Sequence, residues 1–284
     1  MSGRPFIAGL VQCCSGRDIQ NNIDTVSQMI REAANRGAEF VSTPEMTHLL
    51  ETSGERLREV SSLQGDDAGV SRFSALAKDL QIWLNIGSLA IRLNTGRYAN
   101  RSFLFAPDGG LRASYDKIHM FDVQLGEGET YLESKRYRPG ERAVVAELPW
   151  GTLGMTICYD MRFPALYRSL TAAGAGILTI PSAFTVPSGR AHWHTLLRAR
   201  AIEAGAYVLA AAQTGSHECG RQTYGHSLAI DPWGTILADA GEGTGVVLAE
   251  IVPAKIKAAR DRVPAFGAEA DWVPSSEAWA QRTA

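Results

Sequence analysis

Apolar positions early in the chain change period in a way that predicts a strand, a helix and a second strand. The apolar run from Phe6 to Val11 has strand length. Between residues 23 and 33 the apolar positions recur at helical spacing, and Gly37 is suited to end that helix. Phe40-Val41 then leads into Pro44-Glu45. Strand, helix, strand is how an α/β protein begins.

Strands and helices continue to alternate over the rest of the chain. Further helices are predicted at 70–80, 164–173 and 191–204, and further strands at 82–91, 101–106, 143–148, 154–158, 177–180, 207–212, 227–231, 236–238 and 246–251. Turn residues at 94–97 predict an antiparallel pair. No linker, repeat or low-complexity segment interrupts the pattern. We therefore expect one domain over residues 1–284, with a core at about 5–265 and a less regular tail at 266–284.

Composition places the chain among ordinary globular proteins. It has 284 residues, of which 45% are hydrophobic and 20% charged. The net charge of −2, the pI of about 6.3 and the lack of a Lys/Arg run argue against nucleic acid and anionic membranes as partners. No apolar run approaches the roughly 20 residues that span a bilayer, and the first residues do not resemble a secretory signal. We expect a soluble cytoplasmic protein.

The cysteines predict free thiols rather than disulfides or a metal site. They are Cys13, Cys14, Cys158 and Cys219, with no CxxC pair and no Cys/His cluster at zinc-ligand spacing. His192 and His194 are two residues apart on a predicted helix, so they face different directions and make a poor metal pair. We therefore expect a reducing compartment, no metal and a single reactive thiol.

Cys158 has the sequence setting of a nucleophile. It ends the predicted strand 154–158 and precedes the segment Tyr159–Pro164. A nucleophile is well placed at a strand end, before a turn whose backbone N–H groups point back at it. The alternative, a buried cysteine that acts as a small hydrophobic side chain, is the usual case for an isolated cysteine. The polar residues beside Cys158 favour the nucleophile.

Two charged residues are candidate partners of this thiol, although each is ordinary when taken alone. Glu45 stands at the end of a predicted strand, on the rim where α/β proteins usually bind ligands. Lys117 lies in the segment Tyr115–Phe121. Singly, the first fits a solvated loop glutamate and the second fits half of a surface ion pair. Glu133 is a weaker candidate, because it shares a polar loop with two other glutamates.

Other hydrolase and nucleotide-binding motifs are not found in the sequence. Ser182 and Ser188 have no G-x-S-x-G context, so a serine hydrolase is not supported. The glycines at 241–245 lie between predicted strands rather than at the start of a helix, which argues against a phosphate-binding loop.

Three segments, taken together, resemble the catalytic motifs of a known family. Pro44–Met46, Tyr115–His119 and Cys158–Pro164 occur in this order and are similar to the three motifs of the nitrilase (carbon–nitrogen hydrolase) superfamily. The resemblance runs from the first predicted strand to about residue 265. It implies a four-layer α-β-β-α sandwich with mixed sheets.

The resemblance also implies a catalytic triad that converts a small carboxamide to a carboxylic acid and ammonia. Cys158 would attack the amide carbon to form a thioester, and Glu45 would act as general base. Lys117 and the backbone N–H of Tyr159 would bind the oxyanion. Glu133 matches the second glutamate of the family and would support Lys117. This chemistry needs neither a metal nor an organic cofactor.

Further segments point to one branch of the superfamily. Ser182–Phe184, Ala191–Trp193 and Leu197–Glu203 resemble the branch that holds the ω-amidases and the deaminated glutathione amidases. Ala211–Gln213 and Tyr224–Ser227 favour the second of these groups. The expected partner is therefore a small amide.

Two departures from the family pattern bear on the substrate more than on the reaction. Ala165 stands where family members generally have a glutamate after Arg-Phe-Pro. The loop at 123–138 differs from that of the animal enzymes, and in the family this loop lines the substrate entrance.

Substrates of this branch carry carboxylates away from the reacting carbonyl, so a cationic anchor is expected. Arg162, Arg190 and Arg198 are the candidates, although Arg198 also fits a structural role. Phe184 and His192 are further candidates for contact with the substrate.

Rival functions stay open at this point. The same triad would serve an ω-amidase acting on α-ketoglutaramate, a nitrilase proper or an N-carbamoyl hydrolase. A redox protein that oxidises Cys158 to a sulfenate is disfavoured, because a carboxylate such as Glu45 raises the thiol pKa. A binding-only relative would be expected to lack a triad residue, and none is missing.

The resemblance also implies a homodimer or a larger homo-oligomer. In the family, such sandwiches commonly pair through the face that bears the helix after the cysteine motif. Leu166, Leu170 and Ala173 on the predicted helix permit such an interface, and burial in the core is the competing explanation.

Overall fold

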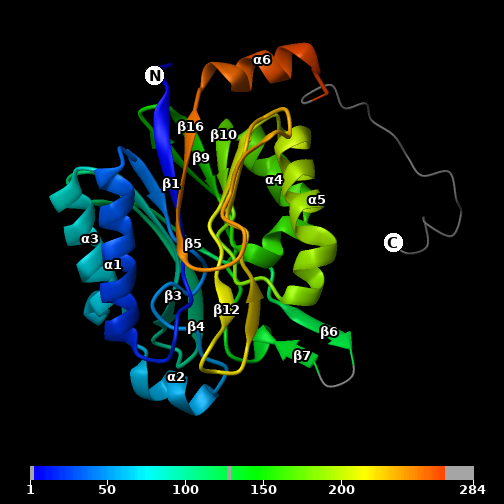
Figure 1. The fold of residues 1–284 in the computed structure, drawn as a ribbon. Coiled ribbons are helices and arrows are strands. Elements are labelled where there is room, and N and C mark those ends of the chain that lie inside the picture. Colours follow the sequence, from blue (N-terminus) through cyan, green and yellow to red (C-terminus); the bar gives the residue numbers. More distant parts are fainter. Residues whose placement is uncertain (1–2, 127–128, 266–284) are drawn as a thin grey trace, which may run out of the picture.

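Two stacked six-stranded β-sheets, with helices on both outer faces, form the body of the protein (Figure 1). The structure, a computed structural model, describes residues 3–126 and 129–265, so the tail expected at 266–284 lies outside the described residues. The first sheet has the order β16 (Gly245–Ile251), β1 (Phe6–Gln12), β2 (Phe40–Ser42), β3 (Trp83–Arg92), β4 (Tyr98–Phe105) and β5 (Leu111–Asp116). The second has the order β15 (Ile236–Asp239), β14 (Leu228–Ile230), β11 (Tyr207–Ala210), β10 (Ala175–Thr179), β9 (Gly151–Met155) and β8 (Val144–Leu148).

Helices on the two outer faces complete four layers. α1 (Ile19–Asn35) and α3 (Ala68–Leu80) cover the first sheet, and α4 (Pro164–Ala172) and α5 (Val186–Ala204) cover the second (Figure 1). Both sheets are mixed, since β1 is parallel to β2 but antiparallel to β16, and β11 is parallel to β10 but antiparallel to β14. The α-β-β-α fold class expected from the sequence is confirmed.

Apolar side chains fill the spaces between the layers. Leu10 and Phe40 of the first sheet belong to one buried cluster with Leu153 and Leu178 of the second. Ile30 of α1 lies in a second cluster, between the first sheet and its helices. Each such side chain stabilises the fold by roughly 1.5–3 kcal/mol when it is fully buried. The apolar positions that recur along the sequence are therefore the positions that pack in these two layers.

The predicted end of the strand that leads to Cys158 is wrong. The sequence predicts a strand over 154–158, but β9 ends at Met155 and Cys158 begins the 3₁₀ turn η3 (Cys158–Arg162). The buried Asp160 carboxylate accepts a hydrogen bond from the Ile157 N–H at 2.9 Å. This local side-chain bond replaces a strand partner and turns the chain before Cys158.

The elements that the sequence did not predict are short or mostly exposed. Besides β5, they are α2 (Gly54–Val60), β6 (Asp122–Gly126), β7 (Glu129–Leu132), β12 (Thr214–Ser216), β13 (Gln222–Tyr224), α6 (Ala254–Arg262), η1 (Gln64–Asp66) and η2 (Glu133–Lys135). α2 buries only Leu57, and α6 buries none of its residues. Such elements have no repeating apolar face, so periodicity does not reveal them.

The apolar residues of α4 are part of the core. Leu166 and Leu170 are buried within the chain, while Ala173 is exposed. Burial therefore accounts for the two leucines that the sequence left open to self-association. Within residues 3–126 and 129–265, no helix is long and apolar enough to cross a membrane.

The candidate site lies at the lower end of the molecule as seen in Figure 1, where β1, β2 and β3 of the first sheet end. α2, β6, β7 and β12 also lie at this end, and α6 crosses the opposite end. Glu45, Lys117 and Cys158 follow β2, β5 and β9, so all three leave the sheets here. All three residues therefore lie at the edge of the sheets where α/β proteins usually bind ligands.

Candidate active site

Cys158 occupies a sharp turn between a strand and a helical turn. It is only 6% exposed, and its φ of 48° is left-handed, a conformation that few residues other than glycine adopt. Its backbone N–H donates to the Pro181 carbonyl at 2.9 Å. Strain of this kind is held only where the surrounding structure fixes it, and it is frequent at functional sites. The thiol is thus presented at a fixed position beside the end of β9.

Asp160 ties the cysteine turn to the segment that carries Lys117. Its buried carboxylate accepts hydrogen bonds from the Tyr115 hydroxyl at 2.7 Å and from the His119 N–H at 3.0 Å. The same carboxylate holds the Ile157 N–H in the turn before Cys158. The two motifs read from the sequence therefore share one buried acid, which fixes Lys117 relative to Cys158.

Glu45 lies in a loop after β2 and has its carboxylate fully bonded. Oε1 accepts from Lys117 Nζ and from Asn100 Nδ2, each at 2.8 Å. Oε2 accepts from the backbone N–H of Ala183, also at 2.8 Å. The backbone carbonyl of Glu45 accepts from Gln213 Nε2 at 3.0 Å. The carboxylate is therefore held from both sheets at once.

Gly87 of β3 lets the Glu45 loop approach the sheet. A Cβ atom at this position would lie 2.1 Å from the Thr43 carbonyl oxygen and 2.4 Å from that of Pro44. These neighbours are backbone atoms, which cannot rotate away. Only glycine allows the loop to lie this close to β3.

Lys117 is a buried ammonium group between two glutamates. Its Nζ donates to Glu45 Oε1 and to Glu133 Oε2, both at 2.8 Å, and the residue is 2% exposed. Asn100 Nδ2 bridges the same two carboxylates, and the Phe121 N–H donates to Glu133 Oε2 at 2.7 Å. The predicted second glutamate is thus in direct contact with the lysine.

Burial and charge set the protonation states of the three residues. Burial, and then the neighbouring Glu45 carboxylate, raise the pKa of the Cys158 thiol well above its ordinary value. Burial alone would raise the pKa of Glu45, but Lys117 and a hydrogen bond with Cys158 lower it overall. Burial lowers the pKa of Lys117, yet Glu133 and Glu45 together raise it well above normal. At neutral pH the site therefore holds a thiol, a carboxylate and an ammonium group.

These residues border a cavity of about 380 Å³, within the roughly 300–1,000 Å³ range of small-molecule sites. Glu45, Lys117, Glu133 and Cys158 all line it, as does Phe184, one of the predicted substrate contacts. Aromatic and apolar walls come from Met46, Leu50, Phe121, Tyr131, Leu132, Tyr137 and Ala183. The cavity is therefore bordered by a thiol, a carboxylate and an ammonium group in one partly apolar space.

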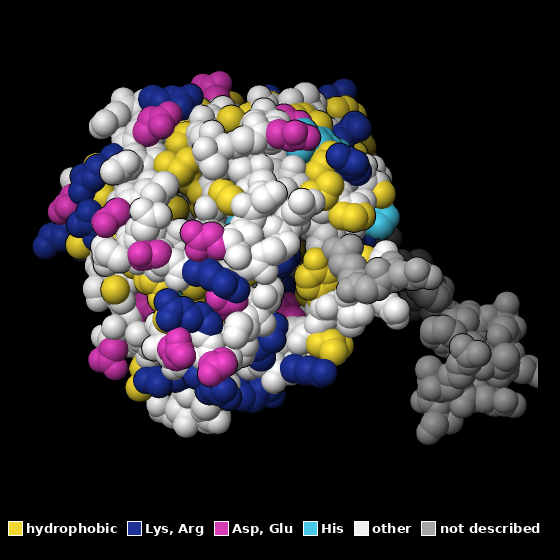
Figure 2. All heavy atoms as spheres, turned by 60° about the horizontal axis from the view of Figure 1, so that its bottom comes forward, with side chains coloured by type: hydrophobic (Ala, Val, Ile, Leu, Met, Phe, Trp, Pro, Cys, Tyr) yellow, Lys and Arg dark blue, Asp and Glu magenta, His cyan; other side chains and the backbone are white. Residues whose placement is uncertain are grey.

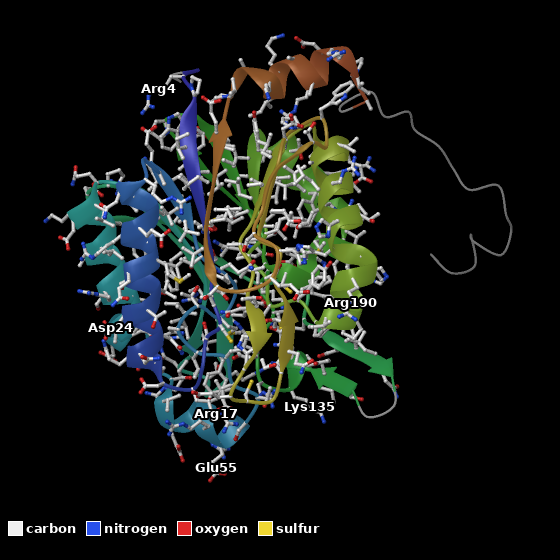
Figure 3. All side chains as sticks on the ribbon, in the orientation of Figure 1. Arg4, Arg17, Asp24, Glu55, Lys135 and Arg190 are labelled. Carbon is white, nitrogen blue, oxygen red and sulfur yellow. The ribbon has the colours of Figure 1, made fainter. Side chains whose placement is uncertain are left out.

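The other predicted substrate contacts do not line this cavity. Arg162 hydrogen-bonds through Nη2 to His192 Nδ1 at 3.2 Å, and its guanidinium lies 5.4 Å from the centre of the Phe184 ring, behind the cavity wall. Arg190 is exposed at the lower end of α5 (Figure 3). Arg198 donates from Nε to the Gly234 carbonyl at 2.9 Å. None of these arginines lines the cavity that Cys158 borders.

Several lining or bridging residues escaped the sequence reasoning. Asn100 was not singled out, because it stands just before the strand predicted at 101–106, although it is buried within β4. Ala183 acts through its backbone N–H, for which side-chain identity gives no signal. Arg136 and Arg221 also line the cavity, and both stand in irregular segments without periodicity.

A separate group of ligand-type side chains lies outside the cavity lining. His194 Nε2 and His226 Nδ1 contact the two carboxylate oxygens of Asp239, at 3.0 and 2.9 Å. Their ligand atoms lie within 4.8 Å of one another, close enough to hold a metal ion. The sequence gives no sign of this group, because His194 and His226 are far apart along the chain.

Comparisons with known proteins agree with this site and fold. The profile of the carbon–nitrogen hydrolase family matches residues 7–261. A deaminated glutathione amidase of Synechocystis sp. is 39% identical over 267 residues, which are 93% of this chain and 97% of that protein. The crystal structure of the Caenorhabditis elegans NitFhit protein superposes with a TM-score of 0.88 and 34% identity, over 95% of this chain and 66% of that one.

A second solved structure covers almost the whole of both chains. Saccharomyces cerevisiae Nit3, described as a member of branch 10 of the nitrilase superfamily, aligns with a TM-score of 0.83 and 30% identity over 92% of this chain and 95% of that one. The chain belongs to the carbon–nitrogen hydrolase family, within the nitrilase superfamily, and is a hydrolase.

Proposed function

We propose that the chain hydrolyses an amide bond of a small anionic molecule, with deaminated glutathione as substrate and Cys158 as nucleophile. One observation carries the proposal: Cys158, Glu45 and Lys117 border one cavity, with Lys117 Nζ 2.8 Å from Glu45 Oε1. The naming of relatives at 39% identity as deaminated glutathione amidases supports the choice of substrate. For that substrate the leaving group is the amine of a dipeptide, rather than the ammonia that a primary amide would release.

The first step is attack by sulfur on the amide carbon. The raised pKa of Cys158 means that the thiol is protonated at rest, so its proton has to leave during the attack. Glu45 is a buried carboxylate with a lowered pKa that borders the same cavity as this thiol, and it takes the proton. The C–S bond forms as the carbonyl π electrons move to oxygen.

The second step is stabilisation and collapse of the tetrahedral intermediate. The ammonium group of Lys117 and the backbone N–H of Tyr159 donate to the oxyanion, which is the largest contribution such sites make to the rate. Glu45 returns its proton to the leaving nitrogen as the C–N bond breaks. The amine departs and leaves a thioester on Cys158.

The third step is hydrolysis of the thioester. Glu45 takes a proton from water, whose oxygen attacks the thioester carbon, and Lys117 again faces the oxyanion. The C–S bond breaks, the sulfur recovers a proton through Glu45, and the carboxylic acid leaves. Glu133 and Asn100 keep Lys117 protonated and in place throughout.

A substrate panel tests this proposal. Deaminated glutathione, α-ketoglutaramate, a simple nitrile and an N-carbamoyl amino acid are incubated separately, and 2-oxoglutarate, ammonia and carbon dioxide are measured. We expect the highest kcat/KM for deaminated glutathione, with no turnover in a folded Cys158→Ala variant. Faster hydrolysis of α-ketoglutaramate by orders of magnitude would assign the chain to the ω-amidases instead.

A further inference from the structure

Two arginines line the cavity and belong to none of the catalytic contacts. Arg136 follows η2 and hydrogen-bonds through its carbonyl to the Tyr98 N–H of β4, on the side of the first sheet. Arg221 precedes β13 and donates from Nη2 to the Ala183 carbonyl at 2.7 Å, on the side of the second sheet. Both residues thus line one cavity, one attached to the first sheet and the other to the segment after β10 of the second.

Each of these arginines has a donor that its surroundings leave unused. Within the part of the chain that the structure describes, the Nε of Arg136 and the Nε of Arg221 are both buried and without a hydrogen-bond acceptor. A buried unpaired N–H costs about 1–3 kcal/mol, and more in a charged group. Donors kept unpaired at this cost beside a cavity indicate that a ligand supplies the acceptor.

The charges that line the cavity also favour a ligand with hydrogen-bond acceptors, in particular an anion. Glu45 and Glu133 are paired with Lys117, and Glu51 is paired with Arg17, whose Nε lies 3.0 Å from Glu51 Oε2. Among the described residues, Arg136 forms no ion pair, and its Cδ lies against Gly54 at the start of α2. On the lower face of the molecule, where Lys135 lies, basic and acidic side chains are interspersed (Figures 2 and 3).

We propose that Arg136 and Arg221 form a two-part carboxylate subsite that selects amides carrying a carboxylate at each end. The planar guanidinium group pairs with a carboxylate through two parallel hydrogen bonds, and one Nε–H of each residue is available for this. This inference rests on the proposed amide hydrolysis. It replaces the anchors Arg162, Arg190 and Arg198 expected from the sequence with two residues that line the cavity.

The positions of the arginines assign one carboxylate to each. Arg221 is linked to the catalytic carboxylate through a single residue, since Ala183 accepts from Arg221 and donates to Glu45. It therefore holds the carboxylate on the acyl side of the scissile bond. Arg136, which is attached to the first sheet through β4, holds the carboxylate of the leaving amine. Deaminated glutathione has both carboxylates, α-ketoglutaramate has the acyl-side one, and butyramide has neither.

These three amides separate a binding role from a structural one. For Arg221→Gln, we expect kcat/KM to fall about tenfold to a hundredfold with both anionic amides and to stay unchanged with butyramide, as for the loss of a charged hydrogen bond. For Arg136→Gln, the same fall is expected with deaminated glutathione alone. Arg221→Lys should restore part of the loss, and Arg72→Gln, which removes an exposed charge on α3, should change nothing.

The outcomes that overturn the subsite are distinct from those that overturn the reaction. Equal losses with all three amides would mean that Arg221 acts only as a countercharge to the glutamates, and unchanged kinetics would remove both arginines from binding. If the parent enzyme hydrolyses none of the amides, the proposed reaction fails. The subsite is then judged by calorimetric binding of glutarate to the Cys158→Ala protein, where equal affinity with and without Arg221→Gln rejects it.

Discussion

Lys117 is a buried cation whose two contacts are both carboxylates, and this arrangement gives it a structural as well as a chemical role. Its ammonium group neutralises Glu45 and Glu133, which would otherwise be buried charges without a partner. Removing one partner of such a pair lowers the free energy of unfolding by much more than the intact pair contributes to it. At the scale of the residue, the stability of the fold and the proposed catalysis therefore both depend on the Lys117 Nζ.

Lys117→Ala is predicted to lower both activity and stability. Loss of an oxyanion donor should reduce kcat about 10²-fold or more, and the two unpaired carboxylates should lower the free energy of unfolding by about 3–5 kcal/mol. Steady-state kinetics and urea unfolding measure the two effects. The Lys257→Ala variant, which removes an exposed lysine on α6 at the opposite end of the molecule, serves as the control. A change in kcat below threefold would exclude Lys117 from the mechanism.

At the scale of the element, the site depends on how closely the Glu45 loop lies to β3. A side chain at Gly87 would meet the Thr43 and Pro44 carbonyls, and the loop they belong to carries Glu45, the proposed general base. The strand itself was predicted from its apolar run, but the need for glycine at one position was not. Close backbone approach between segments distant in sequence leaves no periodic signal.

Gly87→Ala is predicted to displace the Glu45 loop. The added methyl group would meet backbone oxygens, so we expect a loss of about 1–3 kcal/mol in unfolding free energy and a fall in kcat of about tenfold or more from misplacement of the base. Gly65→Ala is the matched control, because a Cβ there would contact nothing within 4 Å. Crystal structures of both variants would show whether Glu45 moves; an unmoved carboxylate with normal kcat contradicts the prediction.

At the scale of the whole molecule, the residues of the proposed active site connect the two sheets. Glu45 and Lys117 follow strands of the first sheet, whereas Cys158 and Ala183 follow strands of the second. The hydrogen bond from the Ala183 N–H to Glu45 crosses between them. The charges of the site consequently contribute to the stability of the entire fold.

Stability is predicted to depend on pH through Glu45 and Lys117. The pKa of Glu45 is lowered by folding, so its contribution is present above about pH 4.5, its ordinary value, and is lost as the pH falls through the folded pKa. The pKa of Lys117 is raised, so its contribution is present below about pH 10.5 and is lost as the pH rises through the folded pKa. Urea unfolding of the parent protein and of Glu45→Gln across pH measures this: the difference between them should shrink in acid. A constant difference would show that Glu45 does not titrate with unfolding.

Local patterns in the sequence were sufficient for the fold class, most of the elements and the catalytic motifs. Apolar periodicity reports which face of an element is buried, and that holds wherever the element packs. The motifs around Glu45, Lys117 and Cys158 are each a short continuous segment, so they can be recognised without a structure. Glu133 was likewise predicted and contacts Lys117.

The contacts between segments that are distant in the sequence depend on packing and could not be predicted from the sequence. Arg136 and Arg221 lie 85 positions apart in irregular segments, and the turn at Cys158 depends on a bond from Asp160 to Ile157 that no apolar pattern signals. The pKa of Cys158 is raised because two sheets bury it beside Glu45. Desolvation and charge proximity are properties of the packed molecule, so they appear only once both sheets are in place.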